Sequence, residues 1–390
     1  MKIARTLLVI VILFLLIEPV FAETGIQTED IILNQLDKIN LSDLQREVNK
    51  INSEVEDYLP SLNLKEILLN FIQGKLEVSW EEIIRSTLKY MGREVTANFY
   101  ILGQIIILAV ISAVLGIFHK SFSSRTISDT AGILIFLVLA VIILQAFQLA
   151  ISIGIKAVDN MVSFMQALLP VLLSLLVSMG ALTSAAIFHP LTFIIITGLS
   201  SAIKYIVFPM IFISAVLSIV TRINDGFSLS RLAGLFKEFS LGLLGLIMII
   251  FIGGLLLQGG AAALTDSLSL RTAKYLTGTF VPVIGGIFSD AIDLIVSCSL
   301  ILKNALNIFG MLAIIFIVAY PIIKIIALVI IYKLASALVQ PIADSRLVDV
   351  LNDLGNSLVF IFLIVSAVSV MFFIIITVVV GTANLTVMMR

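Results

Sequence analysis

The sequence has very little of the chemistry on which most enzymes depend. Its 390 residues include one cysteine, Cys298, and two histidines, His119 and His189. A single cysteine excludes an intrachain disulfide and a cysteine-based metal site. There is no H-E-x-x-H sequence, no phosphate-binding loop and no convincing set of nucleophile, histidine and acid. We therefore predict that the chain is not an enzyme and that it has no cofactor and no metal.

Charged residues are also scarce. They make up 13% of the chain, whereas hydrophobic residues make up 60%; soluble domains have about 25% charged and about 45–50% apolar residues. A membrane-spanning helix needs roughly 20 apolar residues, and the sequence contains several such runs. The chain also lacks the dense basic face of a nucleic-acid-binding protein. We predict an all-α, polytopic membrane protein that contacts membrane lipid and binds no nucleic acid.

The N-terminus has the pattern of an export signal. Lys2 and Arg5 precede an apolar run, and Pro19 is followed by the small-residue pattern VFA at 20–22. A charged start, an apolar centre and a small-residue cleavage site are typical of a secretory signal. We predict a signal peptide over 1–22, with an uncleaved anchor as the alternative. In both cases the following residues begin on the extracytoplasmic side.

Residues 23–97 form an acidic segment, with 14 acidic and 8 basic residues. We expect three helices here, at about 29–58, 62–73 and 79–97. A segment of this size buries little core by itself. One apolar seam therefore predicts packing, either within this chain or against a partner helix. Its residues recur at intervals of three and four: Leu41, Leu44, Val48, Ile51, Val55 and Tyr58.

Residues 98–390 form the predicted membrane domain, with about 8–10 spans. Two pairs of segments echo one another: ISAVLGI at 111–117 with ISAVLSI at 213–219, and SRLAGLFKEFS at 230–240 with SRLVDVLNDLG at 345–355. These echoes suggest internal repeats that start near 101, 208 and 320, with chance similarity between apolar segments as the alternative. The two polar SRL segments are expected to be short helices lying at the membrane surface.

Seven residues of the membrane domain are candidates for a transport path or for helix packing. Charged groups inside spans are costly and usually face the bundle interior or water. Two of them, Asp290 and Asp293, are three residues apart and so share one helix face. Paired glycines permit close helix contact, and broken helices with polar groups are typical of transporter sites. The alternative is that the acids lie in water at a hairpin. The seven are Asp290, Asp293, Lys303, Lys324, Gly285, Gly286 and Pro282.

The layout as a whole resembles one known family, the stage III sporulation protein AE family of endospore-forming bacteria. The resemblance is carried by the order of four stretches over essentially the whole chain: ISAVLGIFHKSF at 111–122, MQALLPVLLSLLVSMGALTSAAIFHP at 165–190, FVPVIGGIFSDAID at 280–293 and RLVDVLNDLGNSL at 346–358. It implies a multi-pass protein of the mother-cell membrane around the forespore. It also implies membership of a multi-protein, secretion-like channel, with ring-forming subunits and a separate ATPase among other stage III sporulation membrane proteins as partners. The family has no catalytic residues to carry over.

Three functions follow as hypotheses. The first is a membrane core subunit of a transport or secretion channel needed for endospore formation, linking mother cell and forespore. The second is an autonomous secondary transporter of a small solute, for which the repeats and the Gly/Pro-containing segments argue. The third is a membrane scaffold that conducts nothing. A homo-oligomer is compatible with each of them.

Overall fold

The computed structural model describes residues 41–55, 61–73, 75, 80–121, 125–223, 229–280, 284–343 and 345–388. Within these ranges every regular element is a helix and no strand occurs. Three helices were expected between residues 29 and 97. The helices that the structure describes there are α3, α4 and α5, and each lies within one of the expected ranges. The elements are α3 (Ser42–Val55), α4 (Leu64–Ile72), α5 (Trp80–Ala97), α6 (Phe99–Ser121), α7 (Arg125–Ser178), α8 (Leu182–Ala202), the π-helix η1 (Ile203–Val207), α9 (Phe208–Ile223), α10 (Ser230–Phe280), α11 (Ile284–Val339) and α12 (Ser345–Met388).

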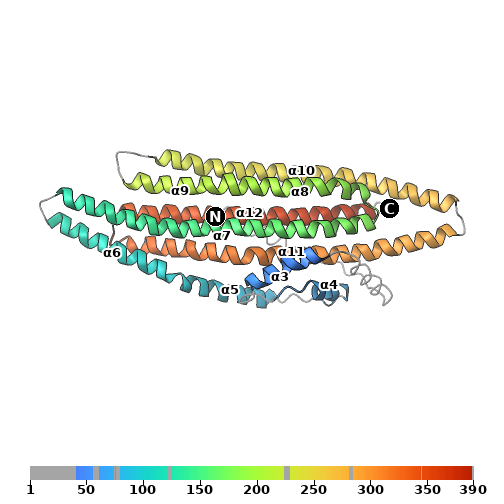
Figure 1. Ribbon diagram of the computed structural model, residues 1–390, viewed down its shortest axis with the longest axis horizontal. Helices are drawn as coiled ribbons and strands as arrows, with labels where there is room; N and C mark the ends of the chain where they lie inside the picture. Colours follow the sequence, from blue (N-terminus) through green and yellow to red (C-terminus); the bar gives the residue numbers. More distant parts are fainter. Residues whose placement is uncertain are drawn as a thin grey trace.

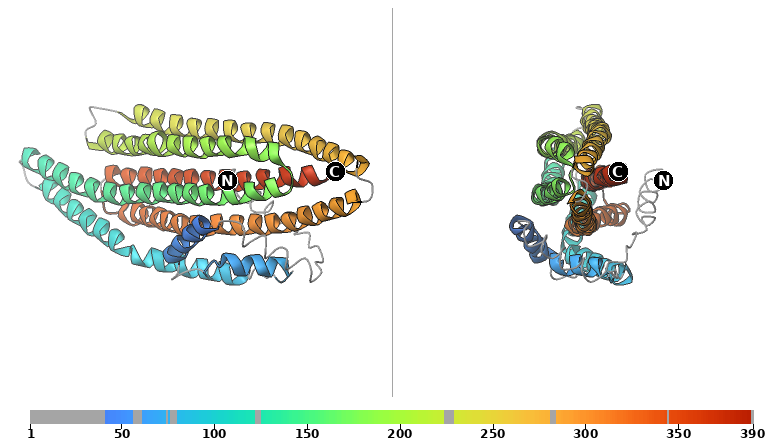
Figure 2. Two further views of the ribbon diagram at one scale, coloured as in Figure 1. Left: turned by 45° about the vertical axis from the view of Figure 1, so that its right-hand side comes forward. Right: turned by 90° about the vertical axis from the view of Figure 1, so that its right-hand side faces the viewer.

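The long helices lie side by side in one elongated bundle (Figures 1 and 2). The chain turns between α6 and α7, between α9 and α10 and between α11 and α12 at one end, on the left in Figure 1, which we call the three-turn end. The turns between α7 and α8 and between α10 and α11 lie at the opposite end, the two-turn end. Helix α12 packs against α7, α8, α9, α10 and α11, which explains why this helix is apolar on nearly all sides.

Six helices of the described residues are long and apolar enough to cross a membrane, by length and composition: Arg85–Ile111, Phe136–Ser178, Leu182–Arg222, Ser230–Leu255, Leu294–Val339 and Ser345–Gly381. The fold is thus that of a polytopic α-helical membrane protein. Residues 125–178, 182–223 and 284–339 are each continuous helix. Helices α7, α10, α11 and α12 contain 44 to 56 residues and are therefore about 66 to 84 Å long. This is between two and three times the roughly 30 Å of a bilayer's hydrocarbon core.

Close helix contacts depend on small residues at two points. A Cβ on Gly310 of α11 would lie 2.7 Å from Leu168 Cδ2 and 3.2 Å from Ile376 Cδ1. A Cβ on Gly154 of α7 would lie 3.0 Å from the ring of Phe208. The absence of a side chain is what lets α7, α11 and α12 approach at these levels, as expected for helices packed by van der Waals contact in a membrane.

The apolar seam of α3 faces the bundle. Leu44, Val48 and Ile51 are buried in the same core as α7 and α11, and Leu41 packs against it. The side chain of Val55 and the whole of Tyr58 lie outside the described residues. A partner helix would have to displace α3 from this chain's own core to reach the described part of the seam. Partner contact through the seam stays a prediction.

The two SRL segments are not separate surface helices. Ser230 begins α10 and Ser345 begins α12, and each segment continues without interruption into its long helix. Both starts lie at the three-turn end (Figure 1). The repeats themselves and the division into three segments at residues 22 and 97 stay predictions.

Candidate functional site

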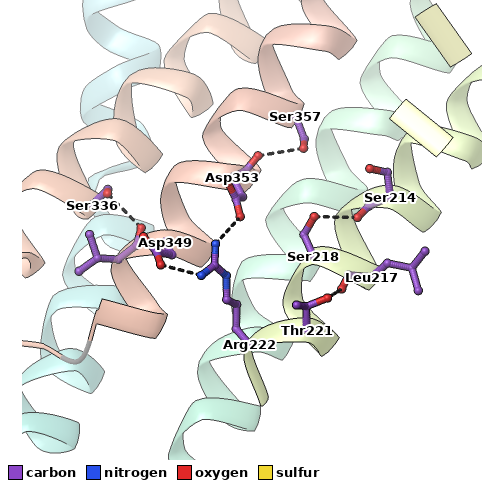
Figure 3. Close-up of polar contacts among 10 residues, drawn as sticks. Ser214, Leu217, Ser218, Thr221, Arg222, Ser336, Asp349, Asp353 and Ser357 are labelled. Carbon is purple, nitrogen blue, oxygen red and sulfur yellow. Dashed lines mark hydrogen bonds and ion pairs between the residues drawn. The ribbon is translucent and has the colours of Figure 1, made fainter. Parts of the chain in front are cut away.

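A polar network joins α9 and α12 near the three-turn end. The guanidinium of Arg222, in the last turn of α9, points toward the first three turns of α12 (Figure 3). Its Nη1 donates to Asp349 Oδ2 at 2.7 Å, and its Nη2 donates to Asp353 Oδ2 at 3.4 Å. The two acids are four residues apart and therefore share one face of α12. One arginine thus holds two carboxylates by charge-assisted hydrogen bonds.

Two lysines extend this network to α10 and α11. Lys333 Nζ donates to Asn352 Oδ1 at 2.7 Å and to Asn356 Oδ1 at 2.6 Å. Lys237 Nζ lies 4.2 Å from the ring centroid of Phe360, within cation–π range. Helices α9, α10 and α11 thus contact α12 through these side chains over residues 349–360; we call this set of contacts the Arg222 network.

A second set of polar contacts lies midway along the bundle. Lys204, in the π-helix η1, donates to Asp159 Oδ1 of α7 at 2.6 Å. Single-turn π-helices are frequent at functional sites. The neighbouring Tyr205 is 72% exposed. This ion pair gives each charge a partner where α7 and the α8–α9 helix pass one another.

Helices α5 and α11 contribute to the same set. Lys324 Nζ lies 3.8 Å from Glu94 Oε1 and 4.6 Å from the ring centroid of Tyr320. Tyr90 and Tyr320 stack with ring centroids 5.6 Å apart. The candidate residue Lys324 thus joins α11 to α5. We call these contacts and the Asp159–Lys204 pair the mid-bundle pairs.

Lys303 is the most deeply buried charged residue of the described chain. Its exposed fraction is 0%, and its Nζ donates to the backbone oxygen of Val380 in α12 at 3.0 Å. An ammonium group inside an apolar bundle costs several kcal/mol of desolvation. Charged residues inside membrane helices are costly and usually face the bundle interior or water, and are therefore functional candidates.

The remaining predicted residues lie at the two-turn end. Helix α10 ends at Phe280 and α11 begins at Ile284. Gly285 and Gly286 fall in the first turn of α11, Asp290 and Asp293 in its next turns, and Pro282 outside the described residues. The structure does not describe the side chains of Asp290 and Asp293. Since α11 is continuous, Asp293 is about 15 Å from Lys303 and about 46 Å from Lys324 along the axis.

One buried acid escaped the sequence reasoning. Asp266 of α10 is 1% exposed, and its two carboxylate oxygens accept hydrogen bonds from the backbone N–H groups of Thr183 and Ser184, each at 2.8 Å. These N–H groups belong to the first turn of α8, whose cap residue Ala181 makes no side-chain hydrogen bond. Asp266 therefore caps α8 from a neighbouring helix.

The described residues contain no group of three or more His, Cys, Asp or Glu side chains that would hold a metal ion. The polar groups present are charged pairs and capping contacts between helices. Such an arrangement fixes helices relative to one another and offers charges inside an apolar bundle.

Comparison with known proteins gives one consistent result. The family described as Stage III sporulation protein AE matches residues 62–383. The Stage III sporulation protein AE of Bacillus subtilis (strain 168) is 38% identical over 342 residues, which covers 88% of this chain and 86% of that protein. No solved structure matches the chain.

Proposed function

The chain belongs to the stage III sporulation protein AE family, and from this membership we propose that it is a membrane core subunit of a multi-protein channel linking mother cell and forespore. Membership supports a role in sporulation and a place among other sporulation proteins. We further propose that the protein lies in the mother-cell membrane around the forespore. Its proposed partners include ring-forming subunits and a separate ATPase.

The burial of Lys303 is the observation that carries this proposal. A scaffold needs only apolar contact between α11 and α12, and a methionine of similar length would provide it. The chain instead places an ammonium at 0% exposure against the carbonyl of Val380. A transport path needs such groups inside the bundle, where they meet ions, water or substrate when the helices separate.

Two further features favour transport that is driven by a partner protein and not by this chain. The sequence contains no phosphate-binding loop. The long helices of the described chain are continuous, with one π-helix at Ile203–Val207, whereas autonomous secondary transporters typically hold their substrate at broken helices. We therefore favour a subunit driven by partners over a transporter that works alone, and we propose no enzymatic step.

The test compares Lys303→Met with Lys89→Met, a change at an exposed position of α5. Each variant replaces the only copy of the protein in the sporulating host, and spore yield, protein level and co-purified membrane proteins are measured. We expect Lys303→Met to lower spore yield while protein level and co-purification stay normal. Normal spore yield in this variant would favour a scaffold, and failure of the unmodified chain to co-purify with any sporulation membrane protein would contradict the subunit assignment.

A further inference from the structure

The bundle has two different sides at the level of α8. Helices α3 and α4 lie on one side, along the same stretch of the long axis as α8 (Figure 1), and pack against α11. Helices α8 and α10 lie on the opposite side, with the other long helices between the two (Figure 2). Transmembrane helices tilt by about 20° on average, so a flat bilayer meets both sides of such a bundle at nearly the same level.

The side covered by α3 is charged. Asp43 and Arg46 form an ion pair on the outer face of α3, and their side chains are 71% and 75% exposed. Glu47 and Lys50 form a second pair on this helix, at 3.9 Å. Exposed ions of this kind would lose their hydration in hydrocarbon. The level of α3 and α4 therefore lies outside the hydrocarbon core, and hydrocarbon does not cover the opposite side at that level.

The opposite side is apolar at the same level. Asp266 of α10 lies against Thr183 of α8, and the two helices are antiparallel (Figure 1). Ile249, 17 residues before Asp266, therefore lies opposite residue 200 of α8. Residues 182–202 and 239–264 contain no Asp, Glu, Lys or Arg. The large exposed side chains here, which we call the α8–α10 face, are Leu182, Ile187, Phe193, Ile194, Leu246, Ile249 and Ile250.

The α8–α10 face is too large and too apolar to be left in water. Its seven side chains are 41–74% exposed. At on the order of 100 Å² each, they present roughly 700 Å² of apolar surface. Proteins in water rarely expose contiguous apolar patches of more than a few hundred Å², and larger patches mark protein–protein interfaces. The face therefore requires a protein partner.

The properties of the face favour a second copy of this chain as that partner. Stable protein interfaces bury about 800 Å² per partner, which the face nearly supplies by itself. Its stretches of α8 and α10 contain no Asp, Glu, Lys or Arg that a different protein would recognise by an opposite charge. Two copies inserted in the same direction present the face at the same level, and a two-fold axis along the bundle brings equivalent residues together.

We propose that the α8–α10 face is a docking surface for a second copy of this chain. The two copies lie side by side, with their α8 and α10 helices in contact and their α3 and α4 helices facing water on the outer sides. This inference rests on the charge and exposure of the described residues and not on the channel role proposed above.

Cross-linking between single cysteines tests this contact. The full chain with Cys298→Ser receives one cysteine at Phe193 or at Ile249, which are 50% and 74% exposed. The control is Asp43→Cys, on the opposite side at the same level. Each protein, in the membranes of its host, is treated with a short bis-maleimide. We expect Phe193→Cys and Ile249→Cys to give mainly covalent dimers, and Asp43→Cys to remain monomeric while a soluble maleimide labels it.

Polar substitutions in the face should weaken the dimer. Phe193→Asn combined with Ile249→Asn should lower the affinity between copies by about tenfold or more, measured as the dependence of molecular mass on protein concentration in mild detergent. Ile107→Asn is the control, because Ile107 is 61% exposed on α6, at the far edge of the bundle (Figure 1); it should leave the affinity unchanged. Circular dichroism checks that each variant is folded.

Three results would overturn the proposal. The first is that Phe193→Cys and Ile249→Cys both stay monomeric after cross-linking. The second is that these cysteines cross-link only to a different protein, which would then be the occupant. The third concerns lipid: in the full chain with Trp80→Phe, a tryptophan at position 193 should keep its emission in vesicles whose acyl chains carry bromine at mid-chain. Strong quenching would show that hydrocarbon covers the face.

Discussion

The contact between Asp266 and the start of α8 makes a strong stability prediction. Both carboxylate oxygens accept a backbone hydrogen bond at 2.8 Å, and the residue is 1% exposed. Asp266→Ala would leave one buried and one partly buried N–H group without this acceptor, at about 1–3 kcal/mol each. It would also remove a negative charge from the positive end of a helix, an effect of up to about 2 kcal/mol in buried geometry.

Allowing for the desolvation of the carboxylate in the native protein, we expect Asp266→Ala to lower the free energy of unfolding by about 3 kcal/mol. Asp266→Asn keeps one acceptor oxygen but loses the charge, so its effect should be about half as large. The measurement is unfolding in mixed micelles by a denaturing detergent, followed by circular dichroism. Asp43→Ala, at the exposed end of the Asp43–Arg46 pair, is the control and should change nothing measurable.

The order of the three variants is the critical result. If Asp266→Ala were no more harmful than Asp43→Ala, the carboxylate would not be capping α8. If Asp266→Asn were as stable as the unmodified chain, the hydrogen bonds would matter but the charge would not, and the contribution of the helix dipole would be refuted.

Two further predictions concern helix packing and charge pairing. Gly310→Ala should lower the free energy of unfolding by about 1–3 kcal/mol, because its Cβ would lie 2.7 Å from a neighbouring side chain. Gly242→Ala, which has nothing within 4 Å, should instead stabilise the protein by about 0.5–1 kcal/mol; equal effects in the two variants would contradict the packing. In a double-mutant cycle, Arg222→Gln and Asp349→Asn should show a coupling energy of about 0.5–1 kcal/mol that shrinks with added salt, since these side chains are 37% and 48% exposed. A coupling near zero at low salt would contradict the ion pair.

The existence of the helices could be predicted from the sequence, but their lengths could not. The spacing of apolar residues and the residues typical of helix ends predicted helices that correspond to α3, α4 and α5. Both signals lie within a few residues of each helix and can therefore be read from the local sequence. The expectation of 8–10 spans rested on apolar runs of roughly 20 residues, each sufficient to cross a membrane. In the structure Asp159 and Lys204 neutralise each other at 2.6 Å across 45 residues of sequence, so both helices continue. A partner that lies on another helix leaves no signal in a local window.

The candidate site was predicted unevenly for the same reason. Lys303 and Lys324 were found because a charge within an apolar run is visible in the sequence. Asp266 was missed because the groups it serves, Thr183 and Ser184, are more than 80 residues away. One signal was available: Ala181 precedes α8 and has no side chain that could cap it. A buried helix start without a local cap requires an acceptor from elsewhere, and the search for one would have led to the acids of α10.

The two SRL segments differ in their contacts with Arg222. Residues 230–240 and 345–355 begin the second helices of two neighbouring hairpins, α9–α10 and α11–α12. In the second segment, Asp349 and Asp353 accept hydrogen bonds from Arg222 of the other hairpin. The corresponding positions of the first segment are Gly234 and the exposed Glu238. The ion pairs therefore connect one hairpin to the other, and neither hairpin contains both partners. A movement that separates the hairpins would have to break it, whereas a movement within either hairpin would leave it intact.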